Sequence, residues 1–137
     1  MKVVVDTNVV VSAIIRDRLP EKILVAIVSS PDIEWIVSGK ILNEYRKVLS
    51  RKKFGIGKDI LEKWFAVFNE TTVLMEVPVE ITFPRDQGDA MFIECAIACE
   101  ADYFITGDRD FEGACQVMKT KILSVSQFSV IVGQIKK

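Results

Sequence analysis

Acidic side chains follow directly after two apolar runs of the chain. Asp6 comes at the end of "KVVV" (2–5), and Asp108 and Asp110 follow "YFIT" (103–106) after a single glycine. Both runs have the β-branched and aromatic composition of buried strands. In open parallel sheets the ligand crevice lies at the carboxyl ends of the strands. If these two strands are neighbours, Asp6 and Asp108 face the same crevice.

Two further acids stand on the apolar sides of expected helices. Glu44 falls at the edge of the apolar stripe of a helix expected at 39–51, where a surface salt bridge is the alternative role. Asp89 falls within the stripe of a helix expected at 87–100. A buried carboxylate without a partner is costly, so Asp89 needs either free backbone N–H groups or a ligand. The sequence makes both acids candidates for the crevice.

The composition limits the chemistry that these acids can do. The 137 residues include no histidine, which excludes His-based acid–base pairs, Ser–His–Asp triads and His-ligated zinc sites. Two carboxylates about 4 Å apart repel by roughly 4 kcal/mol at an effective dielectric constant near 20, so a cluster needs protons or cations. The expected cluster contains Asp6, Glu44, Asp89 and Asp108, with Asp110 as a fifth member. Such an all-oxygen site suits Mg²⁺ or Mn²⁺ and the hydrolysis of a phosphodiester.

The remaining chemistry-bearing residues favour plainer roles. Cys95, Cys99 and Cys115 form an odd set without disulfide-framework spacing, and we expect small core residues in place of metal ligands. Trp35 and Trp64 lie in apolar patterns that indicate core or dimer packing more than base stacking.

Any attraction for nucleic acid has to be local, because the net charge is −1. The loop "RKKFGIGK" (51–58) supplies the candidate phosphate contacts Arg51, Lys52 and Lys53. A solvated basic loop is the alternative reading of the same residues.

Short β-branched runs alternate with helical patterns from end to end. We expect strands at 2–5, 33–37, 72–77, 102–105 and 121–125, and helices at 8–16, 20–30, 39–51, 58–70, 87–100 and 126–135. Ser38 and Asp86 are suitable helix caps. This alternation predicts one α/β domain, a three-layer α/β/α sandwich around a mostly parallel sheet. No apolar run is long enough for a membrane span and no signal peptide is evident, so we expect a cytoplasmic protein.

Three segments together resemble the PIN-domain family of small nucleases over essentially the whole chain. They are "VVVDTNVVVSA", "ILNEYRKVLSR" and "PRDQGDAMFIECAIACEADYFITGDRDF". The positions that match the family's metal-binding acids are Asp6, Glu44, Asp89 and Asp108, and Asp110 matches an acid that some members add. Thr7, Asn8 and Thr106 match polar positions that support metals, water or substrate. Ala90 departs from the pattern, since many relatives carry another acid there.

The resemblance implies a single PIN-like, Rossmann-like nuclease domain over residues 1–137. It also implies a Mg²⁺- or Mn²⁺-dependent endoribonuclease that cleaves single-stranded RNA, commonly as a homodimer. Such a protein would be the toxin of a toxin–antitoxin pair, held inactive by a separate antitoxin protein.

Two other functions remain open from the sequence. A haloacid-dehalogenase-type phosphatase also uses an aspartate after its first strand, but Asn8 and Glu112 stand where that chemistry needs aspartates. A catalytically degenerate PIN fold that serves as a binding or scaffold module is the non-enzymatic alternative, and the complete set of acids argues against it.

Overall fold

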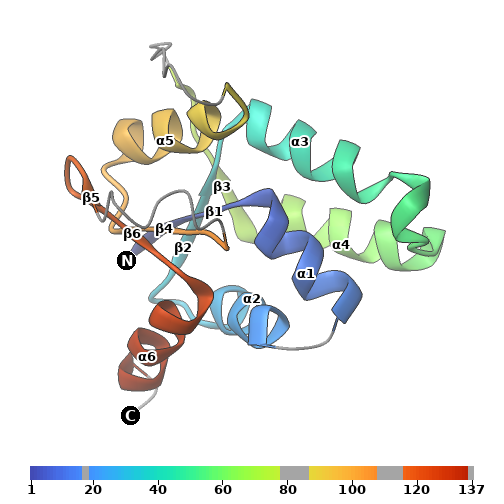
Figure 1. Ribbon diagram of the computed structural model, residues 1–137, viewed down its shortest axis with the longest axis horizontal. Coiled ribbons are helices and arrows are strands. Elements are labelled where there is room, and N and C mark those ends of the chain that lie inside the picture. The colour runs from blue at the N-terminus through green and yellow to red at the C-terminus, as the bar shows by residue number, and fades with distance from the viewer. Residues whose placement is uncertain (17–18, 78–86, 108–115, 136–137) are drawn as a thin grey trace.

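A six-stranded sheet forms the centre of the protein (Figure 1). The structure is a computed structural model that describes residues 1–16, 19–77, 87–107 and 116–135. The strands are β1 (Lys2–Val5), β2 (Glu34–Val37), β3 (Thr72–Leu74), β4 (Tyr103–Ile105), β5 (Gln116–Val117) and β6 (Thr120–Leu123). The helices are α1 (Thr7–Arg16), α2 (Leu19–Ser29), α3 (Gly39–Leu49), the 3₁₀ turn η1 (Lys52–Phe54), α4 (Lys58–Thr71), α5 (Gln87–Cys99) and α6 (Val125–Ile135). Among these described helices, none is both long and apolar enough to cross a membrane.

Successive strands are added first on one side of β1 and then on the other. The sheet runs β3-β2-β1-β4-β6-β5, with β5 antiparallel to β6 and the other neighbours parallel. The chain first builds outward from β1 to β2 and β3, and then returns to add β4 on the other side. The crevice between β1 and β4 is therefore the topological switch point, where folds of this kind bind their ligands.

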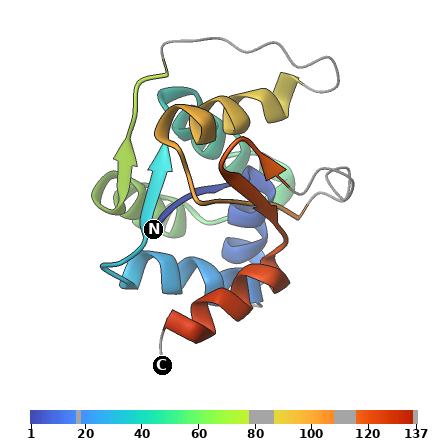
Figure 2. The same cartoon turned by 90° about the vertical axis from the view of Figure 1, so that its left-hand side faces the viewer.

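Helices cover both faces of the sheet, as expected for an α/β/α sandwich. Figure 2 shows α5 on one side of the strands and α1, α2 and α6 on the other. β1 lies in the middle of this sandwich, and Val3, Val4 and Val5 have no exposed surface. Their lack of polar alternation is the pattern of a strand that is buried on both faces, so the expected central position of 2–5 is confirmed.

An aromatic cluster joins β2 to α3 and α4. Trp35 meets Phe68 edge-on at 5.7 Å between ring centroids, and Tyr45 lies 5.4 Å from the same Phe68 ring. Trp64 packs at 6.3 Å from Phe68 on the outer side. The expectation that both tryptophans serve packing is confirmed for these contacts. Ser38 begins α3 as its N-cap, with its Oγ accepting from the N–H of Ile41 at 3.2 Å, also as expected.

The structure differs from the sequence expectation at the sheet margins. β3 ends at Leu74 and not at residue 77, because its partner β2 ends at Val37 and the chain there turns into α3. The β5–β6 hairpin was not expected. Its turn places Met118 at φ 53°, a conformation usually signalled by glycine or asparagine, so the sequence carries no hairpin signal. The proposed cap Asp86 lies outside the described residues.

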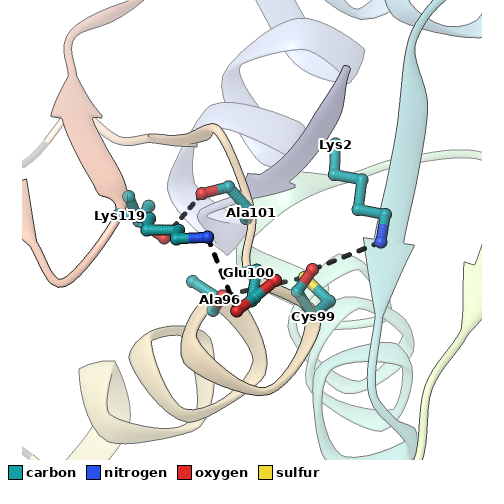
Figure 3. Close-up of polar contacts among 7 residues, drawn as sticks. Lys2, Ala96, Cys99, Glu100, Ala101 and Lys119 are labelled. Atoms are coloured by element: carbon teal, nitrogen blue, oxygen red, sulfur yellow. Dashed lines mark hydrogen bonds and ion pairs between the residues drawn. The ribbon is translucent and has the colours of Figure 1, made fainter.

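Polar contacts at the amino edge of the sheet fasten the end of α5 (Figure 3). The Lys2 ammonium donates to the carbonyl oxygen of Cys99 at 3.4 Å, and Lys119 pairs with Glu100 at 3.8 Å. Thr120 Oγ1 donates to the carbonyl oxygen of Ala101 at 2.8 Å. These contacts lie at the end of the strands opposite to Asp6, so we assign them a structural role.

The two described cysteines are core residues. Cys95 and Cys99 are buried on α5 and are free thiols. A hydrogen bond to Cys99, together with burial, raises the pKa of the Cys95 thiol. The expectation of a packing role is confirmed for this pair, and Cys115 lies outside the described residues.

Candidate functional site

Asp6 occupies the junction between β1 and α1. The strand ends at Val5 and the helix begins at Thr7, so Asp6 is the only connecting residue. Its backbone N–H still donates to the carbonyl oxygen of Ile105 at 2.9 Å, while its Oδ1 accepts from the N–H of Asn8 at 3.3 Å. Aspartate favours this position because its carboxylate caps the free N–H groups of the first helical turn. The side chain is 4% exposed and its place is fixed by the backbone on both sides.

Thr106 holds the other oxygen of the same carboxylate. β4 pairs with β1 so that Ile105 lies beside Val5, which brings Thr106 next to Asp6. Thr106 Oγ1 donates to Asp6 Oδ2 at 2.7 Å, in a site where both residues are buried. The Thr106 N–H donates to the carbonyl oxygen of Leu123 on β6. The sheet register therefore builds this part of the site from residues 100 positions apart.

The two residues after Asp6 differ in their surroundings. Thr7 is 5% exposed, and its Oγ1 has no hydrogen-bond partner among the described residues. A buried hydroxyl without a partner is uncommon and costs free energy unless another group bonds it. Asn8 is exposed. The start of α1 thus presents one unsatisfied buried oxygen beside the Asp6 carboxylate.

Glu44 is positioned through its neighbour in sequence. It is half-buried on α3, as its place at the edge of the apolar stripe predicts. The adjacent Tyr45 is completely buried, and its hydroxyl donates a short hydrogen bond to the carbonyl oxygen of Val5. Trp35 Nε1 donates in turn to the Tyr45 hydroxyl at 3.4 Å. The helix that carries Glu44 is therefore bonded to the strand residue that precedes Asp6.

The environment of Tyr45 keeps its phenol protonated. Burial raises the pKa of Tyr45 far above its usual range, and the negative charge of Asp6 acts in the same direction. The hydrogen bond from Trp35 has the opposite, smaller effect on this pKa. A phenol that keeps its proton can continue to donate to the Val5 carbonyl group.

The other expected acids are described only in part. The backbone of Asp89 lies in the first turn of α5, but its side chain is not described, and Asp108 and Asp110 lie outside the described residues. Within the described part of the chain, no group of three or more acidic or cysteine side chains is close enough to hold a metal ion. The described side-chain atoms at the switch point that could bind a metal belong to Asp6, Thr7 and Thr106, and all of them are oxygen atoms. That donor set fits Mg²⁺ or Mn²⁺ better than a soft metal.

The basic residues lie at the surface, just after the end of α3. Arg51, Lys52 and Lys53 are exposed around η1, which follows α3. The Lys53 ammonium lies 5.0 Å from the centre of the Phe54 ring. The segment is thus a short ordered turn with charges directed to solvent, and not simply a loop.

Sequence reasoning missed one functional contact at this site. It expected core or dimer packing for Trp35 and did not foresee that Trp35 Nε1 and the Tyr45 hydroxyl make buried hydrogen bonds. Buried tyrosine and tryptophan usually place O–H and N–H groups on a partner, so their residue types were a signal. Which carbonyl group they bond depends on how α3 sits on the sheet.

Comparisons with known proteins identify the family of this chain. The chain matches the family model of the PIN domain over residues 2–110. It is 36% identical over 115 residues to the uncharacterized protein MJ1680 of Methanocaldococcus jannaschii, a match that covers 80% of this chain and 72% of that protein.

Among solved structures, the fold is similar to a chain in the crystal structure of VapBC2 from Rickettsia felis bound to a DNA fragment from their promoter. The TM-score is 0.63 at 15% identity, over 90% of this chain and 98% of that chain. At this identity the similarity concerns the fold alone. PIN domains are generally nucleases. The match to the family model, which spans most of the sequence, shows that the chain belongs to the PIN-domain family.

Proposed function

We propose that the protein is a Mg²⁺- or Mn²⁺-dependent endoribonuclease that hydrolyses phosphodiester bonds in single-stranded RNA. The observation that carries the proposal is the Asp6 carboxylate, held by Thr106 at the switch point between β1 and β4. Open α/β sheets bind their ligands at this point, outside the carboxyl ends of the strands. The chain has no histidine to act as a general base, so carboxylates carry the chemistry.

Each site residue has a distinct part in this proposal. Asp6, Glu44, Asp89 and Asp108 are the proposed metal ligands, and Asp110 is a further acid at the same crevice. The bound metal would supply an activated water and neutralise charge on the phosphate. Thr106 orients the Asp6 carboxylate by its hydrogen bond. Thr7 and Asn8 offer polar groups to the ligands or substrate, and Arg51, Lys52 and Lys53 contact RNA phosphates.

The family and the solved relative support the proposal of an antitoxin partner. VapBC2 is a toxin–antitoxin complex, and its similarity in fold supports a toxin-type role for this chain. We propose that residues 1–137 form one nuclease domain that acts as a homodimer and is held inactive by an antitoxin protein.

The activity is tested by cleavage of a single-stranded RNA of mixed sequence. Asp6→Asn keeps the shape of the side chain and an oxygen that caps α1, but removes a ligand charge. We expect wild-type cleavage to stop with EDTA and return with Mg²⁺ or Mn²⁺, and the variant to be inactive while folded. Asp32→Asn, at an exposed turn, is the matched control. Equal cleavage by wild type and Asp6→Asn would indicate a contaminating nuclease and favour a binding module.

A further inference from the structure

A pocket opens at the same edge of the sheet as Asp6, beyond the ends of β2 and β3. Its volume is about 500 Å³. One wall is the first turn of α3 with its cap, a second is the chain after β3, and a third is α5. The lining residues are Ser38, Gly39, Lys40, Leu74, Met75, Glu76, Val77, Met91 and Glu94. This volume falls within the range of pockets that bind small organic groups.

The pocket combines apolar walls with one buried carboxylate. Met75 and Met91 supply long, polarizable thioether side chains, which adapt well to flat ligands. Glu94 is 7% exposed although it carries a carboxylate, and Lys40 also lines the pocket. Glu94 and Lys40 both have interactions within the protein, so neither is an isolated charge, and the third charged lining residue is the exposed Glu76. A carboxylate has several acceptor positions, and Glu94 can therefore accept further hydrogen bonds from a ligand.

We propose that this pocket binds one nucleobase of the RNA strand, with guanine preferred. The inference rests on the proposed function and specifies its substrate. Bases of single-stranded RNA are recognised by apolar contacts on their faces and by hydrogen bonds on their Watson–Crick edges. The two methionines provide the apolar contacts. Glu94 provides the acceptor.

The preference for guanine follows from the hydrogen-bonding capacity of Glu94. A carboxylate only accepts hydrogen bonds, and its two oxygens suit two parallel donors. Guanine carries adjacent N1–H and N2–H₂ donors on its Watson–Crick edge. Adenine, cytosine and uracil each place at least one acceptor beside their donor on that edge, and this acceptor repels a carboxylate oxygen.

The place of the pocket suits a base next to the scissile phosphate. β3 lies two strands from β1, which is roughly 10 Å across the sheet. Lys40 and Glu44 lie one turn apart on α3, so the same helix borders both the pocket and the proposed metal site. A nucleotide with its phosphate near Asp6 can therefore place a neighbouring base in the pocket.

The test uses the four methionines as reporters. Met75 and Met91 line the pocket, whereas Met1 and Met118 lie outside it. Methyl NMR of methionine-labelled protein in EDTA is recorded with GMP, AMP, CMP and UMP at millimolar concentrations. We expect saturable shifts of Met75 and Met91 alone, with GMP bound roughly 10- to 100-fold more tightly than the other nucleotides. Absence of saturable shifts with all four nucleotides overturns the proposal.

Two variants separate base recognition from general binding. Glu94→Gln replaces one acceptor by a donor, so it should remove the preference for GMP while binding of the other nucleotides persists. Gly39→Leu adds a side chain at a lining position where a Cβ meets no atom within 4 Å, so it should narrow the pocket and weaken the binding of all four nucleotides. Gly133→Leu, on the exposed side of α6, has equally open surroundings and should bind as wild type.

The outcomes distinguish this inference from the proposed function. The nucleotide titration needs neither metal nor catalysis. It therefore tests whether the pocket binds a nucleobase even if no RNA is cleaved. If RNA is cleaved, sequencing of the products should show cuts next to guanine that lose this bias in Glu94→Gln. If RNA is cleaved without base bias and the four nucleotides bind with equal affinity, the proposed nuclease activity stands and the proposed guanine preference of the pocket is wrong.

Discussion

Thr106 and Asp6, 100 residues apart in sequence, form a buried hydrogen bond of 2.7 Å at the switch point of the sheet. The bond runs from the end of β4 to the end of β1, the two strands between which the chain reverses its direction of growth. It fixes one oxygen of the Asp6 carboxylate, while the start of α1 fixes the other. The carboxylate is therefore oriented before any ligand binds, which is the arrangement that effective metal sites require.

Thr106→Val should reduce both stability and activity. Valine keeps the shape of threonine but leaves a buried carboxylate oxygen without its donor, at a cost of about 1–3 kcal/mol in the free energy of unfolding. Thr106→Ser keeps the hydroxyl and should remain close to wild type. Urea denaturation and RNA cleavage of the two variants provide the measurements. If Thr106→Val cleaves RNA at the wild-type rate, the orienting role is wrong.

Tyr45→Phe should destabilise the fold without opening a cavity. The variant removes the hydroxyl that bonds the Val5 carbonyl oxygen and accepts from Trp35. Two buried polar groups then lose their partner, and we expect a loss of about 1–3 kcal/mol. Activity should fall as well, because the bond between the Glu44 helix and the Asp6 strand is lost. Tyr103→Phe, on a half-buried tyrosine of β4, is the control.

The same tyrosine predicts a loss of stability at alkaline pH. Its pKa is raised in the folded protein, so the folded state keeps a proton that the unfolded chain releases near pH 10. The stabilising contribution is complete below about pH 10 and falls by about 1.4 kcal/mol per pH unit above it. Urea denaturation between about pH 9 and about pH 11 should show a shallower decline in Tyr45→Phe. Parallel declines in both proteins would contradict the buried, protonated phenol.

Divalent metal should stabilise the wild-type protein and release protons. Binding to the folded state alone raises the free energy of unfolding by about 2.7 kcal/mol at a hundredfold excess over Kd. Clustered carboxylates must lose shared protons when the ion binds. Titration calorimetry with Mn²⁺ in two buffers of different ionisation enthalpy measures the proton release. The melting temperature with and without Mn²⁺ measures the stabilisation. Asp6→Asn should lose both effects and can be more stable than wild type without metal. An equal shift of melting temperature in both proteins would argue against the site.

Lys52→Ala should weaken RNA binding and make it less dependent on salt. Loss of one phosphate contact lowers the slope of log affinity against log salt by about 0.7 for a single strand. The measurement is anisotropy of a labelled RNA in the Asp6→Asn background, where cleavage does not interfere. Lys22→Ala removes an exposed charge on α2 and serves as the control. Identical salt slopes for the two variants would show that the η1 segment is a solvated basic turn without a role in RNA binding.

Local sequence determined most of the helices and strands. Three adjacent valines followed by Asp6 specify a buried strand that stops where a helix cap is needed, and the structure places β1 at Lys2–Val5 as expected. Ser38 specified the start of α3 for the same reason. The lack of histidine led to the proposal that oxygen ligands carry the chemistry. The start and end of a strand or helix depend on residues that are close together in the chain. The local sequence pattern is therefore sufficient to predict them.

Tertiary structure alone decided which residues meet. The sequence could propose that β1 and β4 are neighbours, but only the sheet order put the Thr106 hydroxyl on Asp6. Helical periodicity showed that Tyr45 faces inward, yet the carbonyl group that it bonds depends on the packing of α3. The sequence analysis did not single out Glu94, because its pocket is formed by three separate segments of the chain. Contacts between distant segments depend on how layers pack, and this information is absent from any local pattern.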